Sequence, residues 1–298
     1  MSHRLVVVGA GYACLPAAKR LARRLHRHDV TVTLVNASDR FVERVRLRSI
    51  GYDTLVYAGG SQARFDGVPG AAEHVHAVAA PEQAMRLRYR VAEIASGGTV
   101  AVVGGGLTGL ETASELPESH PWLCVRLFTS ADDVGTGLAP RGRTHLRHAL
   151  DRLGVSIRPK TVVTAVREDG LDTRDGRPCA ADAVVWTTGF RAPDLAGAAG
   201  FATDQIGRIL VDATLRSISL PEVYAIGDAA AGMPVNGTRS RMSCQAALPM
   251  GRGVADVVAA RLTGREPGPR TKTPAVATAD HATTAPDQQP QLAALTPG

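Results

Sequence analysis

The stretch that decides the fold is Thr99-Val100-Ala101-Val102-Val103-Gly104-Gly105-Gly106-Leu107-Thr108-Gly109-Leu110-Glu111. Its apolar first half predicts a buried strand, its glycines a tight turn, and the residues from Leu107 onward the start of a helix. Gly104, Gly106 and Gly109 have the spacing of a dinucleotide fingerprint, whose glycines permit the turn, the approach of a pyrophosphate and close helix–strand packing. The helix N-terminus then offers unpaired N–H groups to the phosphates.

A second copy of this pattern lies near the N-terminus, where residues 4–14 read RLVVVGAGYAC. Gly9 and Gly11 fit the fingerprint, and the small apolar Cys14 takes the third position. The next predicted strand, 30–35, ends at Asn36, where an acid would bind a ribose hydroxyl. Asparagine can still bond the hydroxyl but carries no charge. The sequence therefore predicts two nucleotide sites, and the one at Gly104–Gly109 is the better preserved.

Composition allows a substantial core, and the placement of the basic residues argues against nucleic-acid binding. The chain has 298 residues, is 44% hydrophobic and carries a formal charge of +6, with 31 arginines against 3 lysines. The densest basic group follows one face of the first predicted helix: Lys19, Arg20, Arg23, Arg24 and Arg27. We interpret it as a solvated helix face with a weak attraction for anionic lipid, and we expect no nucleic-acid partner.

Cysteine usage predicts a reducing environment. Cys14, Cys124, Cys179 and Cys244 are scattered, so the sequence holds no C-x-x-C pair and no zinc spacing, and we expect no metal. No signal peptide is recognisable, and no apolar run reaches the ~18–20 residues of a membrane span. These features predict a cytoplasmic protein, with at most a peripheral contact at the inner face of the cell membrane.

The remaining chain alternates between strand and helix patterns before its character changes at residue 265. Beyond the stretches quoted above, we expect a loop over 62–81, helices over 82–96, 140–153 and 243–262, and strands over 125–128, 155–158, 161–167, 182–187 and 209–212. Asp53 is expected to position its strand rather than act as an acid. Residues 265–298 are rich in Pro, Thr, Ala and Gln and predict a disordered tail, because they cannot bury enough apolar surface.

Several motifs together carry a family likeness. Besides the two fingerprints, they are Tyr52-Asp53-Thr54-Leu55-Val56 with its glycine turn, Thr187-Thr188-Gly189-Phe190, and Tyr224-Ala225-Ile226-Gly227-Asp228, in this order. Over residues 4–264 the chain resembles the pyridine nucleotide-disulfide oxidoreductase superfamily. Within it, the chain is most similar to the type II NADH dehydrogenases, which are NADH:quinone oxidoreductases.

The resemblance implies an α/β fold with two Rossmann-like dinucleotide-binding domains. The FAD-binding domain would be discontinuous, over residues 1–96 and 189–264, and the NAD(P)H-binding domain would be inserted at 97–188. The tail, 265–298, would stand outside both.

The resemblance also implies the site. Hydride would pass from NAD(P)H to FAD, and the helix that begins near Ser243 would point its N-terminus at the flavin. Glu111 would be the catalytic acid that orients the nicotinamide or pairs with Arg44 or Arg46; the alternative is a first-turn glutamate that only complements the helix dipole. The implied cofactor-binding residues are Gly9, Gly11, Cys14, Asn36, Arg44, Gly60, Gly104, Gly106, Gly109, Thr188, Gly189, Gly227, Asp228, Gln245 and Ala246.

The electron acceptor follows from the cysteines. Disulfide reductases of this superfamily need a close cysteine pair beside the flavin, which this sequence lacks, so a quinone or another small-molecule acceptor is expected. The coenzyme stays open between NADH and NADPH, because the strand that ends at Phe128 is followed by neither an acid nor an arginine.

Two departures from the family pattern leave a second function open. Only Ser49-Ile50-Gly51 separate Arg48 from Tyr52, where the family has further strands, and the tail stands where the family has a C-terminal domain. A shortened first domain would expose a sheet edge and weaken FAD binding. The alternative is therefore a degenerate, non-catalytic nucleotide-binding protein; a nucleic-acid binder would be a third reading, supported by charge alone.

Overall fold

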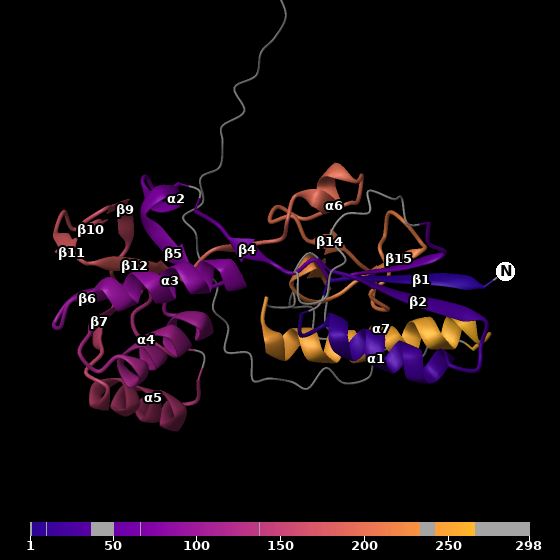
Figure 1. The fold of residues 1–298 in the computed structure, drawn as a ribbon, viewed down its shortest axis with the longest axis horizontal. Helices are drawn as coiled ribbons and strands as arrows, with labels where there is room; N and C mark the ends of the chain where they lie inside the picture. The colour runs from indigo at the N-terminus through magenta and orange to yellow at the C-terminus, as the bar shows by residue number, and fades with distance from the viewer. Residues whose placement is uncertain are drawn as a thin grey trace, which may run out of the picture.

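The structure, a computed structural model, describes residues 2–9, 11–36, 51–65, 67–136, 138–232 and 242–265. These residues form two α/β units that lie end to end along the long axis of the molecule (Figure 1). Of the described residues, those within 2–63 and 190–265 form the first unit and those within 64–189 form the second. Sequence reasoning expected an α/β fold with two Rossmann-like units, and that expectation is confirmed.

The first unit is built on a parallel sheet of order β15-β3-β1-β2. Its elements are β1 (His3–Val8), α1 (Cys14–Leu25), β2 (Val30–Val35), β3 (Thr54–Tyr57), β4 (Gln62–Ala63), β13 (Phe190–Arg191), α6 (Leu195–Ala198), β14 (Ile209–Leu210), β15 (Val223–Ala225), η1 (Gly227–Ala229), β16 (Ala230–Ala231) and α7 (Cys244–Leu262). Among the described strands, β2 stands at one edge of this sheet.

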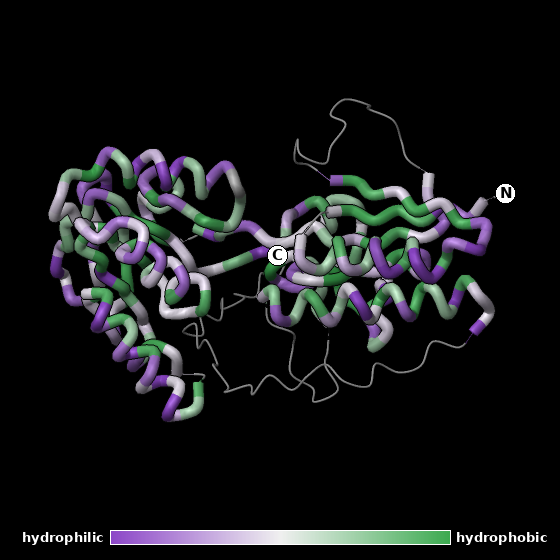
Figure 2. The backbone as a smooth tube through the Cα atoms, turned by 60° about the horizontal axis from the view of Figure 1, so that its bottom comes forward, coloured by the Kyte–Doolittle hydropathy of each residue, from purple (hydrophilic) through white to green (hydrophobic). Residues whose placement is uncertain are grey.

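The core of this unit lies between the sheet and a layer formed by α1 and α7. Ala17, Leu21 and Leu25 recur at helical spacing on α1 and are fully buried, and they pack with the buried face of α7. Figure 2 shows the helices alternating between hydrophobic and hydrophilic residues, as expected for helices with one buried face. On the outer face, Asp256 of α7 binds both Arg20 and Arg24 of α1, so part of the predicted basic face is paired rather than free.

An ion pair holds the sheet at its amino edge. The Arg4 backbone N–H donates to Asp53 Oδ2 at 2.8 Å, and the Arg4 guanidinium donates to both carboxylate oxygens. These bonds keep the pKa of Asp53 well below its usual range. Asp53 therefore joins β1 to the start of β3, the positioning role expected from the sequence, at the opposite edge from the glycine turns.

The second unit is built on a parallel sheet of order β5-β12-β6-β7-β8. Its elements are α2 (Ala71–His74), β5 (Val75–Ala77), α3 (Pro81–Glu93), β6 (Thr99–Val103), α4 (Leu107–Ser119), β7 (Cys124–Phe128), α5 (Pro140–Arg152), β8 (Ser156–Arg158), β9 (Val163–Arg167), β10 (Gly170–Thr173), β11 (Pro178–Ala180) and β12 (Ala183–Trp186). Hydrophobic clusters cover both faces of this sheet, which explains its continuous apolar strands.

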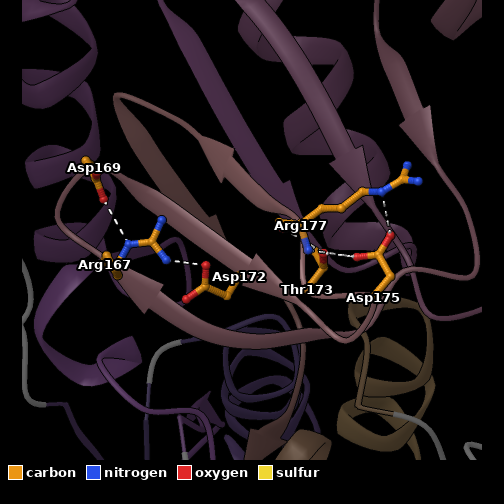
Figure 3. A network of polar contacts seen from close by, with 6 residues as sticks. All are labelled: Arg167, Asp169, Asp172, Thr173, Asp175 and Arg177. Carbon is orange, nitrogen blue, oxygen red and sulfur yellow. Dashed lines mark hydrogen bonds and ion pairs between the residues drawn. The ribbon is translucent and has the colours of Figure 1, made fainter.

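Between β8 and β12 the chain forms a three-stranded antiparallel sheet of order β11-β10-β9. Polar contacts fix its turns (Figure 3): Arg167 binds Asp169 at 3.1 Å and also Asp172, while the Thr173 hydroxyl donates to Asp175. Sequence reasoning found β9 but missed β10 and β11, because these short strands carry mixed polar residues whose order depends on this pairing.

The boundary between the units lies earlier than the predicted residue 97. β5 pairs with β12 in parallel, and α3 buries Leu87 and Val91 against the second sheet, as does Ile94 just after it, so the segment from β5 to α3 belongs to the second unit. Residues 62–81, expected as a loop, contain β4, α2 and β5. β5 forms a strand with only three residues because it pairs with the buried strand β12. The tail predicted over 265–298 lies, after Arg265, outside the described residues.

A two-stranded ribbon joins the units. β4 and β13 pair antiparallel, with Phe190 opposite Ala63, and the backbone N–H of Arg64 donates to the Gly189 carbonyl at 2.6 Å. The indole of Trp186 donates to the Arg64 carbonyl at 3.1 Å. Both crossings of the chain between the units are therefore tied to one another, which is the connection a nested insertion requires.

The packing of α1 on α7 leads to a stability prediction. A Cβ at Gly251 of α7 would lie 2.0 Å from the Ala13 carbonyl oxygen. Gly251→Ala should therefore push the two helices apart and lower the free energy of unfolding by about 1–3 kcal/mol, which denaturant titration measures. Gly142→Ala is the matched control, because its Cβ would make only a 3.5 Å contact with Leu138 and its helix gains propensity. An equal change in the free energy of unfolding of the two variants would contradict the packing argument.

Candidate functional site

The carboxyl ends of the first sheet gather most of the residues predicted for the first cofactor. The backbone N–H of Gly9 donates to the Val35 carbonyl at 2.7 Å, which places Gly9 beside the end of β2 and Asn36. The N–H of Ala58 donates to the Val8 carbonyl at 2.8 Å, and that of Ile226 donates to the Tyr57 carbonyl at 3.0 Å. The segments that carry Gly9, Asn36, Gly60 and Gly227 therefore meet at one edge, the usual ligand-binding edge of an open parallel sheet.

The first glycine loop has the shape of a pyrophosphate cradle. Gly9 has φ +110°, and a Cβ there would lie 2.3 Å from the Ala58 carbonyl oxygen, so only glycine fits. A Cβ at Gly11 would meet nothing within 4 Å, so its backbone faces open space. α1 begins two residues after Tyr12, and its N-terminus has no side-chain cap. This geometry fits the phosphates of a dinucleotide.

Cys14 stands at the third glycine position of the fingerprint and makes a contact there that glycine cannot make. It is the buried first residue of α1, and its thiol donates a hydrogen bond to the Gly9 carbonyl. Burial raises the pKa of the Cys14 thiol to about 11, so the group stays protonated and remains a donor at neutral pH. The helix is thus fastened to the turn by a hydrogen bond as well as by close packing.

Asp228 is held by a residue that sequence reasoning missed. Asp228 lies in η1, directly after β15, and its Oδ2 accepts a hydrogen bond of 2.7 Å from the Ser61 hydroxyl. Ser61 follows Gly60, which adopts φ +71°. The signal was present, because a polar residue followed a glycine turn at a strand end. Its partner, 167 positions away, could not be read from the sequence.

The start of α7 reaches the same region. A Cβ at Gly227 would lie 3.1 Å from Ala13 Cβ and 3.8 Å from Ala247 Cβ, so η1 and the first turns of α1 and α7 converge. Ser243 caps α7 by accepting a bond from the Ala246 N–H at 3.3 Å. Gln245 is exposed and Ala246 is half-buried. Their predicted contacts with the flavin stay predictions. Arg44 and Arg46 lie outside the described residues.

In the second glycine loop all three fingerprint glycines are present, and their surroundings differ in the same way as those of the glycines in the first loop. Gly104 has φ +126°, and a Cβ there would lie 2.6 Å from Thr187 Oγ1. A Cβ at Gly109 would lie 1.8 Å from the Gly104 carbonyl oxygen, whereas one at Gly106 would meet nothing within 4 Å. α4 begins at Leu107 without a side-chain cap, so its first N–H groups face the open side of the loop. This loop therefore fits a second pyrophosphate.

Thr187, which sequence reasoning noted only as part of the Thr187–Phe190 motif, fixes this second loop. It is buried, and its hydroxyl donates to the Val103 carbonyl at 2.9 Å, immediately before Gly104. Thr188 and Gly189, which were predicted to bind cofactor, follow it, are exposed, and lead into the ribbon. Gly189 adopts φ +68°.

Glu111 is exposed on α4, and the first turn of this helix contains no acid. Glu111 thus begins the second turn, so the alternative interpretation as a first-turn glutamate does not describe its position. The side chain is exposed to solvent, and its catalytic role stays a prediction.

The described residues contain no cluster of three metal-ligating side chains, and none of their helices combines the length and hydropathy that a membrane crossing requires. All four cysteines are free thiols: Cys14 is buried, Cys179 is half-buried, and Cys124 and Cys244 are exposed.

The comparison with known proteins identifies the family of the chain. Residues 33–251 match the model of the pyridine nucleotide-disulphide oxidoreductase family. The chain belongs to this family. The expectations of a flavin-dependent NAD(P)H oxidoreductase, and of FAD and NAD(P)H as its cofactors, are confirmed at the level of the family.

Curated relatives place the chain among NADH dehydrogenase-like proteins. A NADH dehydrogenase-like protein of Mycobacterium tuberculosis is 33% identical over 312 aligned positions, covering 84% of this chain and 78% of the relative. The type II NADH:quinone oxidoreductase of Haemophilus influenzae is 27% identical, and the match spans 70% of this chain and about half, 55%, of that protein. The alignment with the Mycobacterium tuberculosis protein is longer than this chain, so that relative contains residues with no counterpart here.

Solved structures share the fold. The ferredoxin reductase of the CYP199A2 system from Rhodopseudomonas palustris superposes with a TM-score of 0.71 at 24% identity, covering 90% of this chain and 78% of that one. The reduced CoADR-RHD protein of Bacillus anthracis superposes with a TM-score of 0.71 at 20% identity, and the match covers 87% of this chain and 57% of that chain.

The cysteines offer a test of the flavin position. Cys244 is exposed at the start of α7, whereas Cys124 is exposed at the start of β7, on the amino edge of the second sheet. Added FAD should slow alkylation of Cys244 and leave Cys124 unchanged, as mass spectrometry of iodoacetamide-treated protein would measure. Cys14 should stay unmodified near pH 8, because its pKa of about 11 and its burial suppress the thiolate. Equal protection of Cys124 and Cys244 would contradict this placement.

Proposed function

We propose that this protein oxidises NAD(P)H bound at Gly104–Gly109, transfers the hydride to FAD bound on the first unit, and passes electrons to a quinone or another small-molecule acceptor. The observation that carries this proposal is the pair of glycine cradles. Each combines a sterically obligatory first glycine, an open second position and an uncapped helix N-terminus at the carboxyl edge of its own parallel sheet. Two such cradles suit one reaction between two dinucleotides.

The flavin supplies the redox chemistry when bound, because its ring accepts a hydride and can release electrons singly or in pairs. The protein supplies binding, orientation and electrostatics. The hydrogen bond from Ser61 keeps the Asp228 carboxylate facing the site. The positive end of α7 favours negative charge beside it by about 0.5–2 kcal/mol. Glu111 is suited to orient the nicotinamide, since it lies on α4 just beyond the glycine loop.

The acceptor is proposed from the relatives and from the thiols. The relative named type II NADH:quinone oxidoreductase supports a quinone. Terpredoxin reductase from Pseudomonas, 33% identical over 76% of this chain and 55% of that protein, is a relative that would instead support an electron-carrier protein. The protonated, buried Cys14 is a poor nucleophile, which supports a route without a redox disulfide.

The first test is optical. The purified full-length protein, incubated with FAD and desalted, should retain the visible absorbance of a flavin. Anaerobic NADH or NADPH should bleach it, and a soluble short-chain quinone should restore it. A protein that retains no flavin would reject the proposal in favour of the non-catalytic nucleotide-binding alternative. Reoxidation by a small ferredoxin and not by quinone would replace the proposed acceptor.

Glu111→Gln tests the role of this acid. The first-order rate constant of flavin bleaching, measured by anaerobic stopped flow, should fall by roughly 10- to 100-fold, because a misplaced nicotinamide reacts slowly. The FAD content should not change. Glu118→Gln is the control, since Glu118 is exposed further along α4. A Glu111→Gln protein with the same bleaching rate as the parent would remove Glu111 from the mechanism.

A further inference from the structure

The end of β7 lacks a carboxylate free to bind a ribose. In Rossmann units, an acid at the end of the strand beside the glycine loop binds the ribose 2′-hydroxyl of NADH and disfavours a 2′-phosphate. The N–H of Gly104 donates to the Phe128 carbonyl at 2.8 Å, so β7 is that strand, and the residues that follow it are Thr129 and Ser130. Thr129 is buried, whereas Ser130 is exposed.

The two acids that come next are already engaged. The Asp133 carboxylate binds the Arg147 guanidinium and accepts a bond of 2.7 Å from the Val134 N–H, and its side chain is only 20% exposed. Asp132 is 87% exposed and lies 3.5 Å from the Lys160 ammonium. The Asp133 carboxylate is therefore not an unpaired acceptor for a ribose hydroxyl, and Asp132 lies beside a cation that a 2′-phosphate would also attract.

β8 brings cations to this same strand end. The N–H of Thr129 donates to the Arg158 carbonyl at 3.0 Å, and the N–H of Lys160 donates to the Ala131 carbonyl at 2.9 Å. A backbone hydrogen bond thus holds Lys160 against the loop that contains Ser130, although Lys160 and Ser130 are 30 positions apart in the sequence. Its side chain is 72% exposed and extends over this loop toward Asp132.

We propose that the nicotinamide coenzyme of this protein is NADPH, and that Ser130 and Lys160 bind its 2′-phosphate. This inference rests on the proposed function only in requiring that the loop at Gly104–Gly109 binds a dinucleotide. A 2′-phosphate carries about −1.5 to −2 charges at pH 7, and an ammonium paired with it forms a charge-assisted bond that a ribose hydroxyl cannot equal. Arg158, also exposed at the end of β8, adds positive charge to the same side.

The test measures binding, because binding at this loop needs neither flavin nor turnover. Isothermal titration calorimetry on the full chain compares adenosine 2′,5′-diphosphate with adenosine 5′-diphosphate. We expect the 2′-phosphorylated compound to bind roughly tenfold more tightly at low salt, and this advantage to shrink as salt rises.

Variants identify the residues responsible. Lys160→Gln should remove most of the advantage of the 2′-phosphate while leaving the affinity for adenosine 5′-diphosphate unchanged, and Lys160→Arg should retain it. Ser130→Asp should reverse the preference, because it places an acid at the strand end. Arg152→Gln, at the exposed end of α5, is the control and should change neither affinity.

The outcomes separate the two proposals. Equal affinity for the two compounds, or a 2′-phosphate preference that survives Lys160→Gln, would overturn the NADPH inference and leave the proposed function standing. If neither compound binds, the loop at Gly104–Gly109 is not a nucleotide site, and the proposed function fails with it.

Discussion

The rest of the structure depends on the close approach of backbone to backbone at the two glycine loops. A Cβ at Gly109 would lie 1.8 Å from the Gly104 carbonyl oxygen, and a Cβ at Gly9 would lie 2.3 Å from the Ala58 carbonyl oxygen. Because these contacts exclude any Cβ, α4 and α1 begin directly against the ends of their sheets. Their uncapped N-termini then face the open positions at Gly106 and Gly11, where a pyrophosphate can approach.

One short segment serves both the second loop and the connection between units. Thr187 holds the Val103 carbonyl at the base of the glycine loop, while its neighbour Trp186 holds the Arg64 carbonyl in the first crossing of the chain. Gly189 then turns the chain into the ribbon with φ +68°. A displacement of the β4–β13 ribbon would therefore also displace Gly104. The contacts that join the two units thus help to position the loop at Gly104–Gly109.

Opposite edges of the first sheet have different roles. The amino edge carries a paired Arg4–Asp53 contact whose function is structural, because it ties two neighbouring strands together. The carboxyl edge carries the glycines, Asn36 and the Ser61–Asp228 bond, which leave backbone and a polar side chain exposed to a ligand. The same separation holds in the second unit, where the exposed Cys124 lies at the amino edge and Ser130 at the carboxyl edge.

The sequence by itself determined the two glycine loops and the strands and helices that flank them, because glycine spacing and apolar periodicity are local signals. The boundary expected at residue 97 was too late and β10 and β11 were missed, because β5 forms only where β12 pairs with it and β11 only where β10 pairs with it. Only the tertiary structure decided which polar groups act together. Ser61 meets Asp228, Thr187 meets Val103, and Lys160 meets the loop after β7 because parallel strands far apart in the chain end at the same edge.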